Sequence, residues 1–336
     1  MTTRLDGYEH REGIFCGSTA IRNLLGWAGL QLSEPVAFGL GAGLDFHYLC
    51  SETSPRRRIL GRSLTLEDGV ADSLGLTVHT LEPGSPHEGM SVIEKYLADG
   101  VPVLVRCDGS RLPYRDRHPP YGARRIVVVG LDADGGWVSV SDGAVEEVTR
   151  VERDDFLHAW WSEDLPEAEG GGVAHVFESD QTRELDEAIL RAVARNCREM
   201  TTRDGQTHGL EALSRFREEV GQWKSLDDGT ACYRAAYQAM ENPETGGGNY
   251  RSLYREFLKE AEQRVPSLGN LQAGLSMTRT ADAWSTLGTY LSAMTTYLAT
   301  DGEEPGENPA HHVESMAEAV YQFESTFWDR IRSLEG

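Results

Sequence analysis

The spacing of hydrophobic residues along the chain changes near residue 180. Before that point, short apolar runs alternate with helix-like segments, and the pattern predicts strands at 76–81, 101–106, 125–131, 138–140 and 173–177. Residues 126–129 are continuously apolar, which is typical of a central strand. After about Thr182 the apolar spacing is helical, over 185–198, 210–223, 231–240, 250–264, 281–299 and 312–331. The sequence therefore predicts the fold class α+β, with an α+β domain at residues 1–180 and an all-α domain at 181–336.

Another helix is predicted to begin at Cys16, with Ile21, Leu24, Leu25 and Ala28 as its buried stripe. The unpaired N–H groups and the dipole at a helix N-terminus favour a thiolate over a thiol. This position therefore suits a nucleophilic cysteine. The alternative is a small buried residue at the start of a core helix, and the local pattern leaves both interpretations open.

Two segments that contain glycine are predicted to be turns or loops. Residues 38–46 are too rich in glycine for a regular element, and they follow a helix-start signal at Ser33. Asp45 in this loop is a candidate to face a substrate amine, with a turn residue as the alternative. The loop lacks the strand–GxGxxG–helix context, which argues against a dinucleotide site. Residues 132–136 are predicted to join two strands as a hairpin turn.

Charge and cysteine content narrow the function classes. The 336-residue chain carries a net charge of −22, which excludes a general nucleic-acid binder and would attract a small amine-containing substrate. Its five cysteines are odd in number and lack zinc-ligand spacing, so neither a disulfide framework nor a metal is expected. The N-terminus does not look like a signal peptide, and no apolar run reaches about 18 residues. We therefore expect a cytoplasmic protein without a membrane span and without a resident cofactor.

Several motifs together resemble a known family. The first begins at Cys16 and reads Cys-Gly-Ser-Thr-Ala-Ile-Arg-Asn-Leu-Leu. It is followed by Leu-Ser-Glu-Pro at 32–35, Phe-Gly-Leu-Gly-Ala-Gly-Leu at 38–44 and Gly-Arg at 61–62. These motifs resemble the N-terminal domain of the butirosin-type acyltransferases, bacterial natural-product enzymes with a papain-like fold. Residues 207–213 and 244–251 resemble the helical companion domain of unknown function, so the resemblance covers nearly the whole chain.

This resemblance implies a cysteine nucleophile that takes an acyl group from a carrier-protein thioester and passes it to an amine. Cys16 matches the nucleophile, and Asp142, at the end of a predicted strand, matches the family's aspartate. Arg124 stands where the family has a histidine, and Phe15 replaces the histidine that usually precedes the cysteine. The phosphopantetheine arm of a carrier protein would be the donor, so a carrier protein is an expected partner, with a partner subunit as the alternative.

Arg124 changes the expected mechanism. A guanidinium stays protonated, so it cannot act as a general base as histidine does, although its charge can stabilise a thiolate. His118, in a proline-rich loop, is the nearest histidine in the chain that could replace the missing base. A solvated loop residue is the alternative interpretation of His118. Other histidines lack partner spacing and are expected to be surface or core residues: His47, His158, His175, His311 and His312.

Two segments are candidates for binding an anion such as a phosphate, carboxylate or sulfate. The first is a concentration of arginines around the predicted cleft, which could bind such an anion. The alternative is a solvated loop whose charges are balanced by nearby acidic residues. The arginines are Arg106, Arg111, Arg115, Arg117, Arg124 and Arg125. A glycine-rich loop before a predicted helix could add backbone N–H donors. The alternative for this loop is a flexible segment with Asn249 as the N-cap. Its candidate residues are Thr245, Gly246, Gly247, Asn249 and the neighbouring Arg251.

Three functions remain open from the sequence. The first is acyl or aminoacyl transfer through Cys16. The second is another tailoring step on an amine substrate, such as aziridine ring closure with loss of sulfate, for which arginines would serve instead of histidine. The third is a non-catalytic subunit of a heteromeric enzyme. The predicted catalytic residues are Cys16, Arg124 and Asp142, and the predicted substrate-binding residues are Asp45, His118, Arg125, Thr245, Gly246, Gly247, Asn249 and Arg251.

Overall fold

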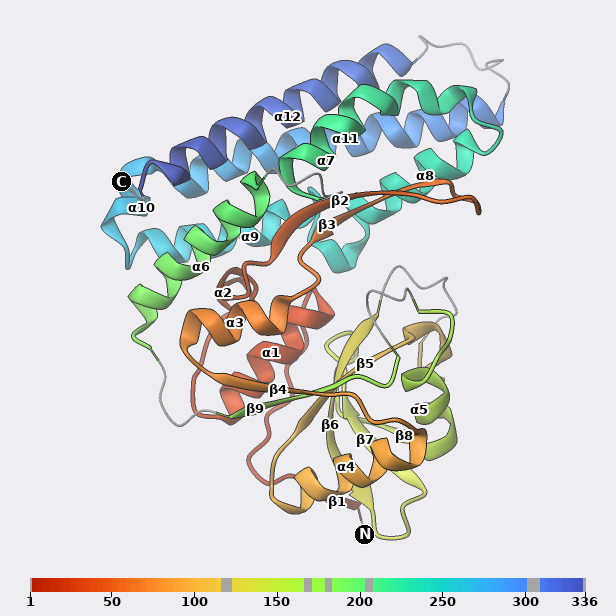
Figure 1. Cartoon of the computed structure of the whole chain (residues 1–336), viewed down its shortest axis with the longest axis vertical. Coiled ribbons are helices and arrows are strands. Elements are labelled where there is room, and N and C mark those ends of the chain that lie inside the picture. The colour runs from red at the N-terminus through yellow and green to blue at the C-terminus, as the bar shows by residue number, and fades with distance from the viewer. Residues whose placement is uncertain are drawn as a thin grey trace. The chain divides into compact units, whose positions relative to one another are not determined.

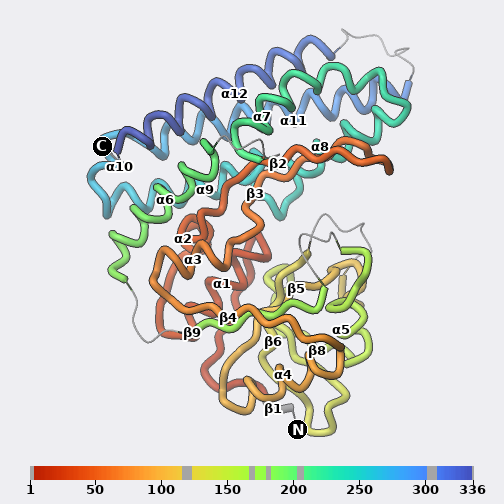
Figure 2. The backbone as a smooth tube through the Cα atoms, in the orientation of Figure 1, coloured from red at the N-terminus to blue at the C-terminus, as the bar shows by residue number. Residues whose placement is uncertain are grey.

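The structure is a computed structural model that describes residues 2–115, 123–165, 171–178, 183–202, 208–300 and 309–334. The chain divides into two compact units (Figure 1, Figure 2). The first comprises Met1–Ala37 and Leu64–Arg183, and the second comprises Phe38–Ser63 and Glu184–Gly336. Residues 38–63 therefore group with the helical unit, although the sequence-based division assigned them to the domain at 1–180.

The first unit is built on an antiparallel sheet. Its strands follow the order β4 (Thr77–Leu81), β9 (Ala174–Glu178), β5 (Val103–Cys107), β6 (Arg124–Asp132), β7 (Trp137–Ser141) and β8 (Thr149–Glu152). The short strand β1 (Thr2–Arg4) also pairs with β6. Residues 126–129 of β6 are completely buried, as the continuous apolar run predicts for a central strand.

Helices cover both faces of this sheet within the first unit (Figure 1). Ile126 and Val128 pack with residues of α4 (Pro86–Ala98) and α5 (Arg153–Trp160). Alternate residues of a strand point to opposite faces, so Arg125 lies on the other face. There it contacts Glu67 of α3 (Leu66–Leu74), next to α1 (Cys16–Trp27), which packs against β6.

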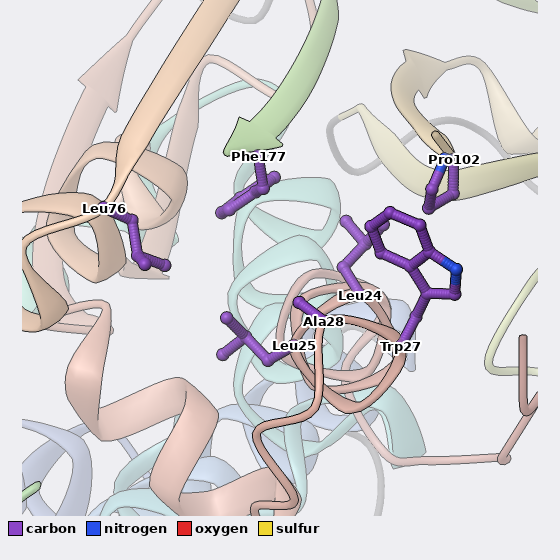
Figure 3. Close-up of a pocket in the computed structure, with 7 residues that line it drawn as sticks. All are labelled: Leu24, Leu25, Trp27, Ala28, Leu76, Pro102 and Phe177. Carbon is purple, nitrogen blue, oxygen red and sulfur yellow. The ribbon is translucent and has the colours of Figure 1, made fainter. Parts of the chain in front are cut away.

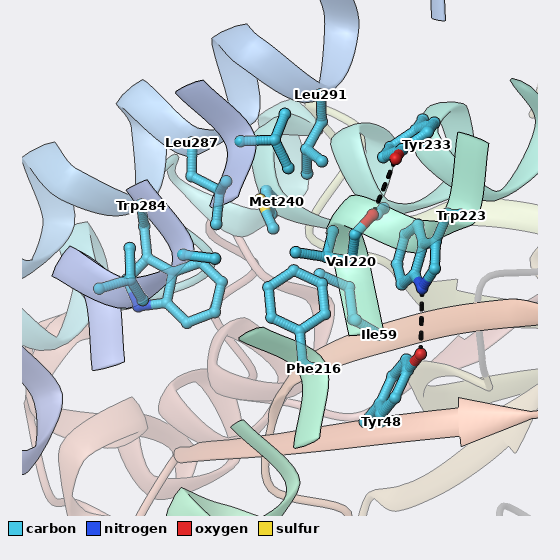
Figure 4. Packing of buried hydrophobic residues seen from close by; sticks show 14 of the residues in the cluster. Tyr48, Ile59, Phe216, Val220, Trp223, Tyr233, Met240, Trp284, Leu287 and Leu291 are labelled. Atoms are coloured by element: carbon cyan, nitrogen blue, oxygen red, sulfur yellow. Dashed lines mark hydrogen bonds between the residues drawn. The ribbon is translucent and has the colours of Figure 1, made fainter. Parts of the chain in front are cut away.

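The second unit is a set of helices completed by a β-hairpin. Its helices are α6 (Leu185–Thr201), α7 (Gly209–Glu219), α8 (Gly229–Glu241), α9 (Arg251–Glu262), α10 (Pro266–Leu271), α11 (Ala273–Ala299) and α12 (Ala310–Arg332). The hairpin consists of β2 (Leu44–Cys50) and β3 (Arg57–Arg62). Tyr48 and Ile59 of the hairpin enter the same hydrophobic core as residues of α7, α8, α11 and α12 (Figure 4). The indole N–H of Trp223 donates to the Tyr48 hydroxyl at 3.1 Å, which anchors the hairpin in that core.

The prediction of a loop over residues 38–46 is wrong. Helix α2 occupies Glu34–Leu40, and β2 begins at Leu44. The glycines in this run permit close packing: an ideal Cβ on Gly39 would lie 2.1 Å from the Phe257 ring. A glycine-rich run can therefore signal close approach of two elements rather than flexibility.

The other predictions from periodicity are confirmed. The five predicted strands correspond to β4, β5, β6, β7 and β9, and the predicted helices correspond to α1, α6, α7, α8, α9, α11 and α12. The turn between β6 and β7 has Gly135 at a φ of +69°. The elements that were not predicted include β1, the β2–β3 hairpin, β8, α3, α4, α5 and α10. Among the described residues, no helix is both long and apolar enough to cross a membrane.

Candidate functional site

Cys16 is the first residue of α1, and only 7% of its surface is exposed. Phe15 before it has an extended backbone, with φ of −108° and ψ of 124°, and its side chain offers no helix cap. Glu34 instead accepts hydrogen bonds from the backbone N–H groups of Ile14 and Phe15, both at 2.8 Å. The thiol therefore sits at the end of α1 where unpaired N–H groups create a positive potential.

Arg124 and Asp142 form a buried, bidentate ion pair. Nε of Arg124 donates to Oδ2 of Asp142 at 2.7 Å, and Nη2 donates to Oδ1 at 2.6 Å. The Asp142 side chain has no exposed surface, and that of Arg124 is 7% exposed. The Tyr114 hydroxyl and the N–H of Ala144 also donate to this carboxylate, each at 3.1 Å. Four donors therefore converge on Asp142.

These contacts determine how the cluster ionises. Burial by itself raises the pKa of Asp142, but the hydrogen bonds and charge of Arg124 outweigh burial, so this pKa lies below its ordinary value. Burial and the charge of Asp142 both raise the pKa of Tyr114. Arg115 adds a second guanidinium 3.6 Å from Asp142. At neutral pH Asp142 is therefore ionised beside the two guanidiniums, and the phenol of Tyr114 stays neutral.

The buried thiol of Cys107 is affected by the charges of this ion pair and of Cys16. Cys107 on β5 is the register partner of Arg124 on β6, and it is completely buried. Burial raises the pKa of the Cys107 thiol, Asp142 and Cys16 raise it further, and Arg124 lowers it. The three predicted catalytic residues therefore lie within electrostatic range of one buried thiol. The fold thus pairs Arg124 directly with Asp142, and Cys16 lies in the same unit at the start of α1.

The loop before α1 also contacts the turn that follows β7. The N–H of Gly13 donates to the carbonyl of Gly143 at 3.0 Å. The His10 ring bridges two groups of this turn, with Nδ1 2.7 Å from Oγ of Ser141 and Nε2 2.8 Å from the carbonyl of Val145. Sequence reasoning did not identify His10, because its partners lie more than 130 positions away in the chain.

The missing histidine base does not reappear beside the thiol in the described part of the chain. There, no hydrogen bond joins the Cys16 thiol to a histidine. His10 makes its contacts to the turn after β7, and His118 lies among residues 116–122, outside the described residues.

Arg125 does not share the surroundings of Arg124. It is completely buried, and its Nε donates to Oε1 of Glu67 at 2.5 Å. Arg106 donates to the other oxygen of Glu67 at 3.1 Å. Burial raises the pKa of Glu67, but the two arginines outweigh burial and leave it below its ordinary value. Arg125 is therefore part of a buried ion cluster under α3, which corrects its assignment as a substrate-binding residue.

The Asp45 carboxylate is engaged by its own unit. Its Oδ1 accepts hydrogen bonds from the N–H groups of Phe46 at 2.7 Å and Gly209 at 3.1 Å. Nε2 of His47 lies 3.2 Å from Oδ2, and Nδ1 of His208 lies 3.5 Å from Oδ1. Burial raises the pKa of Asp45, but the two imidazoles outweigh burial and lower it below its ordinary value. Both oxygens thus face groups of the chain rather than a substrate amine. His47 has Asp45 as a partner, which its spacing in the sequence did not reveal.

The loop predicted to bind an anion uses its donors internally. The N–H groups of Gly246, Gly247, Gly248 and Asn249 donate to acceptors of the same unit at 3.1 to 3.2 Å. The Thr245 hydroxyl donates to backbone carbonyls at 2.8 Å. Residues 246–250 all have positive φ, between 54° and 83°, so the loop winds in the left-handed region before α9 begins. None of these four N–H groups is left for an anion.

Arg251, after this loop, lies in the core of the second unit. It is completely buried, and its Nε donates to Oε1 of Glu324 at 2.6 Å. Its Nη1 donates to the carbonyls of Gly61 at 3.0 Å and Asn249 at 2.8 Å. Arg251 therefore joins the hairpin and α9 to α12. This structural role corrects its assignment to substrate binding.

A cavity of the first unit lies at the C-terminal end of α1, away from Cys16 (Figure 3). Its lining is apolar and contains none of the predicted catalytic residues: Leu24, Leu25, Trp27, Ala28, Leu76, Pro102 and Phe177. Within the described ranges, no group of three histidine, cysteine, aspartate or glutamate side chains is placed to hold a metal ion.

Comparisons with known proteins identify two family domains in the chain. Residues 15–143 match the family described as Butirosin biosynthesis protein H, N-terminal, and residues 155–331 match the Domain of unknown function (DUF4872). No curated protein gives a significant match. The first match contains Cys16, Arg124 and Asp142, and it indicates a tailoring enzyme of the butirosin-biosynthesis type. The chain belongs to the DUF4872 family, here preceded by an N-terminal domain of the butirosin biosynthesis protein H family.

Proposed function

We propose that this protein transfers an acyl or aminoacyl group from a carrier-protein thioester to an amine through Cys16. The observation that supports the proposal is the position of Cys16 at the N-terminus of α1, inside the segment that matches the butirosin biosynthesis protein H family. A cysteine at the start of a helix packed on an antiparallel sheet is also consistent with a papain-like fold, which we propose for the first unit. The phosphopantetheine arm of the carrier supplies the acyl group in this proposal, and the reaction needs no resident cofactor.

In the first half-reaction, the Cys16 thiolate attacks the carbonyl carbon of the donor thioester. A bond forms between Sγ and that carbon, and the bond from the carbon to the carrier sulfur breaks. The carrier departs as a thiolate, which is stable enough near neutral pH to leave without protonation. The step exchanges one thioester for another, so it needs no general acid.

In the second half-reaction, the acceptor amine attacks the acyl group on Cys16. A carbon–nitrogen bond forms, the bond to Sγ breaks, and the Cys16 thiolate is regenerated. The amine reacts as its free base, and the proton that it loses on forming the amide passes to solvent or to the carrier thiolate. Peptide hydrolysis differs because its leaving amine must be protonated, a task that suits histidine. Arginine in place of histidine is therefore compatible with transfer from a thioester and argues against a peptidase.

Arg124 contributes charge in this mechanism rather than proton transfer, because a guanidinium stays protonated. Its two hydrogen bonds to Asp142 fix the plane of the guanidinium. Arg115 supplies a second positive charge beside the same carboxylate. In this proposal the positive charge of Arg124 lowers the energy of a thiolate at Cys16 and of the oxyanion that forms during attack. Asp142 acts as a positioning residue for Arg124.

The decisive experiment is acylation of the purified protein with acetyl-pantetheine, read by intact-protein mass spectrometry. The wild type is expected to gain one acetyl group on Cys16 and to pass it to an added amine. Cys16→Ala should lose both reactions by at least about 10³-fold. Cys50→Ser is the matched control, because Cys50 is an exposed free cysteine of the second unit, and it should keep both. Full activity in Cys16→Ala contradicts the proposal.

The same variants separate the two alternative functions. A tailoring reaction without an acyl-enzyme would survive in Cys16→Ala and fail in Arg124→Lys, which keeps the charge but loses the bidentate geometry. A non-catalytic subunit would show no turnover alone. It would co-purify with the partner protein that carries the catalytic activity. Either result replaces the acyltransferase proposal.

A further inference from the structure

The carboxylate of Glu34 contacts the chain on both sides of Cys16. Its Oε1 accepts the N–H of Phe15 at 2.8 Å and the hydroxyl of Ser18 at 2.9 Å, and its Oε2 accepts the N–H of Ile14 at 2.8 Å. Glu34 is only 7% exposed, so water does not compete freely for these bonds. It is the first residue of α2 and reaches across to the N-terminus of α1.

The surroundings of Glu34 are closely packed. An ideal Cβ on Gly13 would lie 2.5 Å from Oε2 of Glu34 and 2.0 Å from Oγ1 of Thr19. A side chain at Gly13 would therefore displace the carboxylate or the first turn of α1. Because Glu34 ties residues 14, 15 and 18 to one group, it determines where the backbone of Cys16 lies.

We propose that Glu34 is the positioning residue of the Cys16 nucleophile, and that its negative charge restrains formation of the Cys16 thiolate. This inference rests on the proposed role of Cys16 as a nucleophile. The N–H groups at the start of α1 favour any negative charge placed beside them. Glu34 already supplies one, so a thiolate at Cys16 would be a second negative charge at the same helix end.

Other charges near this helix end act in the opposite direction. Burial lowers the pKa of Arg22 on α1, and the charge of Glu34 opposes that shift, so the two side chains are within electrostatic range. On the sheet side, the guanidiniums of Arg124 and Arg115 both pair with Asp142. In this proposal the carboxylate of Glu34 opposes a thiolate at Cys16, and the charge of Arg124 favours it. Among the described residues, the titratable and charged groups on the elements at this helix end, or acting on the Cys107 thiol, include Glu34, Arg22, Arg11, Cys107, Arg124, Asp142 and Asp108.

The test is the rate at which iodoacetamide alkylates Cys16 between pH 5 and pH 9, followed by mass spectrometry of the peptide that contains it. The protein is the full chain carrying Cys50→Ser, so that the exposed thiol does not react. Glu34→Gln keeps the shape of the side chain and removes its charge. We expect this variant to alkylate about 3- to 10-fold faster at pH 7, with its pH curve moved to lower pH and the same plateau at high pH.

Ser18→Ala is the matched control, because it deletes one of the three hydrogen bonds to Glu34 without changing charge. It should lower the melting temperature and leave the alkylation curve in place. The inference is overturned if a folded Glu34→Gln protein alkylates at the wild-type rate, or if its curve moves to higher pH.

A second variant covers the case in which Glu34→Gln does not fold. Arg22→Gln removes the positive charge near Glu34 and should slow alkylation at pH 7; an unchanged or faster rate overturns the inference. Alkylation is measured without donor or amine, so it is independent of the acyl-transfer assay. If Glu34→Gln speeds alkylation of Cys16 and Cys16→Ala keeps full acyl-transfer activity, the proposed function is refuted. The electrostatic effect of Glu34 on Cys16 would still stand.

Discussion

Replacing Asp142 with asparagine tests the buried ion pair on which the proposed site depends. Arg124 is 7% exposed and directs two N–H groups at this carboxylate, and the Tyr114 hydroxyl and the Ala144 N–H share it. An amide has one acceptor oxygen and no charge, so the guanidinium would remain buried with part of its hydrogen bonding lost. Removing one partner of a buried pair costs about 3–5 kcal/mol, and we expect Asp142→Asn to lower the free energy of unfolding by that amount.

The assay is urea denaturation at pH 7 followed by tryptophan fluorescence. Asp134→Asn is the matched control, since Asp134 lies in the exposed turn between β6 and β7, and it should change stability by less than about 0.5 kcal/mol. A double variant, Arg124→Met with Asp142→Leu, leaves no buried charge and should be more stable than Asp142→Asn. The reasoning is refuted if Asp142→Asn costs less than about 1 kcal/mol, or if the double variant is the less stable of the two.

Two further predictions concern the packing of each unit. Gly61→Ala should destabilise the second unit by about 1–3 kcal/mol, because an ideal Cβ there lies 1.9 Å from Oδ1 of the buried Asn249; a wild-type melting temperature would contradict this. Glu67→Gln should cost about 3–5 kcal/mol at pH 7, because Arg125 and Arg106 lose their shared carboxylate. The pKa of Glu67 is lowered in the fold, so its contribution is present above its unfolded pKa of about 4.3 and is lost as the pH falls. The difference in melting temperature between wild type and Glu67→Gln should therefore narrow below about pH 4, and a gap that widens on acidification would disprove the argument.

Neighbouring arginines on β6 show where sequence reasoning reached its limit. Arg124 and Arg125 were both assigned to one predicted cleft, but consecutive residues of a strand point to opposite faces. Arg124 therefore meets Asp142, whereas Arg125 meets Glu67 under α3. The opposite directions of Arg124 and Arg125 could be predicted from the sequence once the strand was predicted. The acidic partner of each arginine could not be predicted, because it depends on which elements cover each face of the sheet.

The hairpin of the second unit is a second example. One of its strands follows a run of glycines, and the inward residues of both strands pack on helices that come more than 150 positions later. Local periodicity cannot reveal such partners. For the same reason Asp45 and Arg251 were interpreted as groups that face a ligand, although their polar atoms are used by the chain itself.

By itself the sequence determined most helices of the second unit, five strands of the first, the change from mixed to helical structure near residue 180, and the placement of Cys16 at the start of a helix. These features follow from the spacing of apolar residues over a few turns, which is a local property. Only the tertiary structure decided that residues 38–63 join the helical unit, that Arg124 is locked to Asp142, and that Glu34 holds the backbone around Cys16. The physical reason is that a buried charge is stable only beside a specific partner, and chain folding rather than sequence distance chooses that partner.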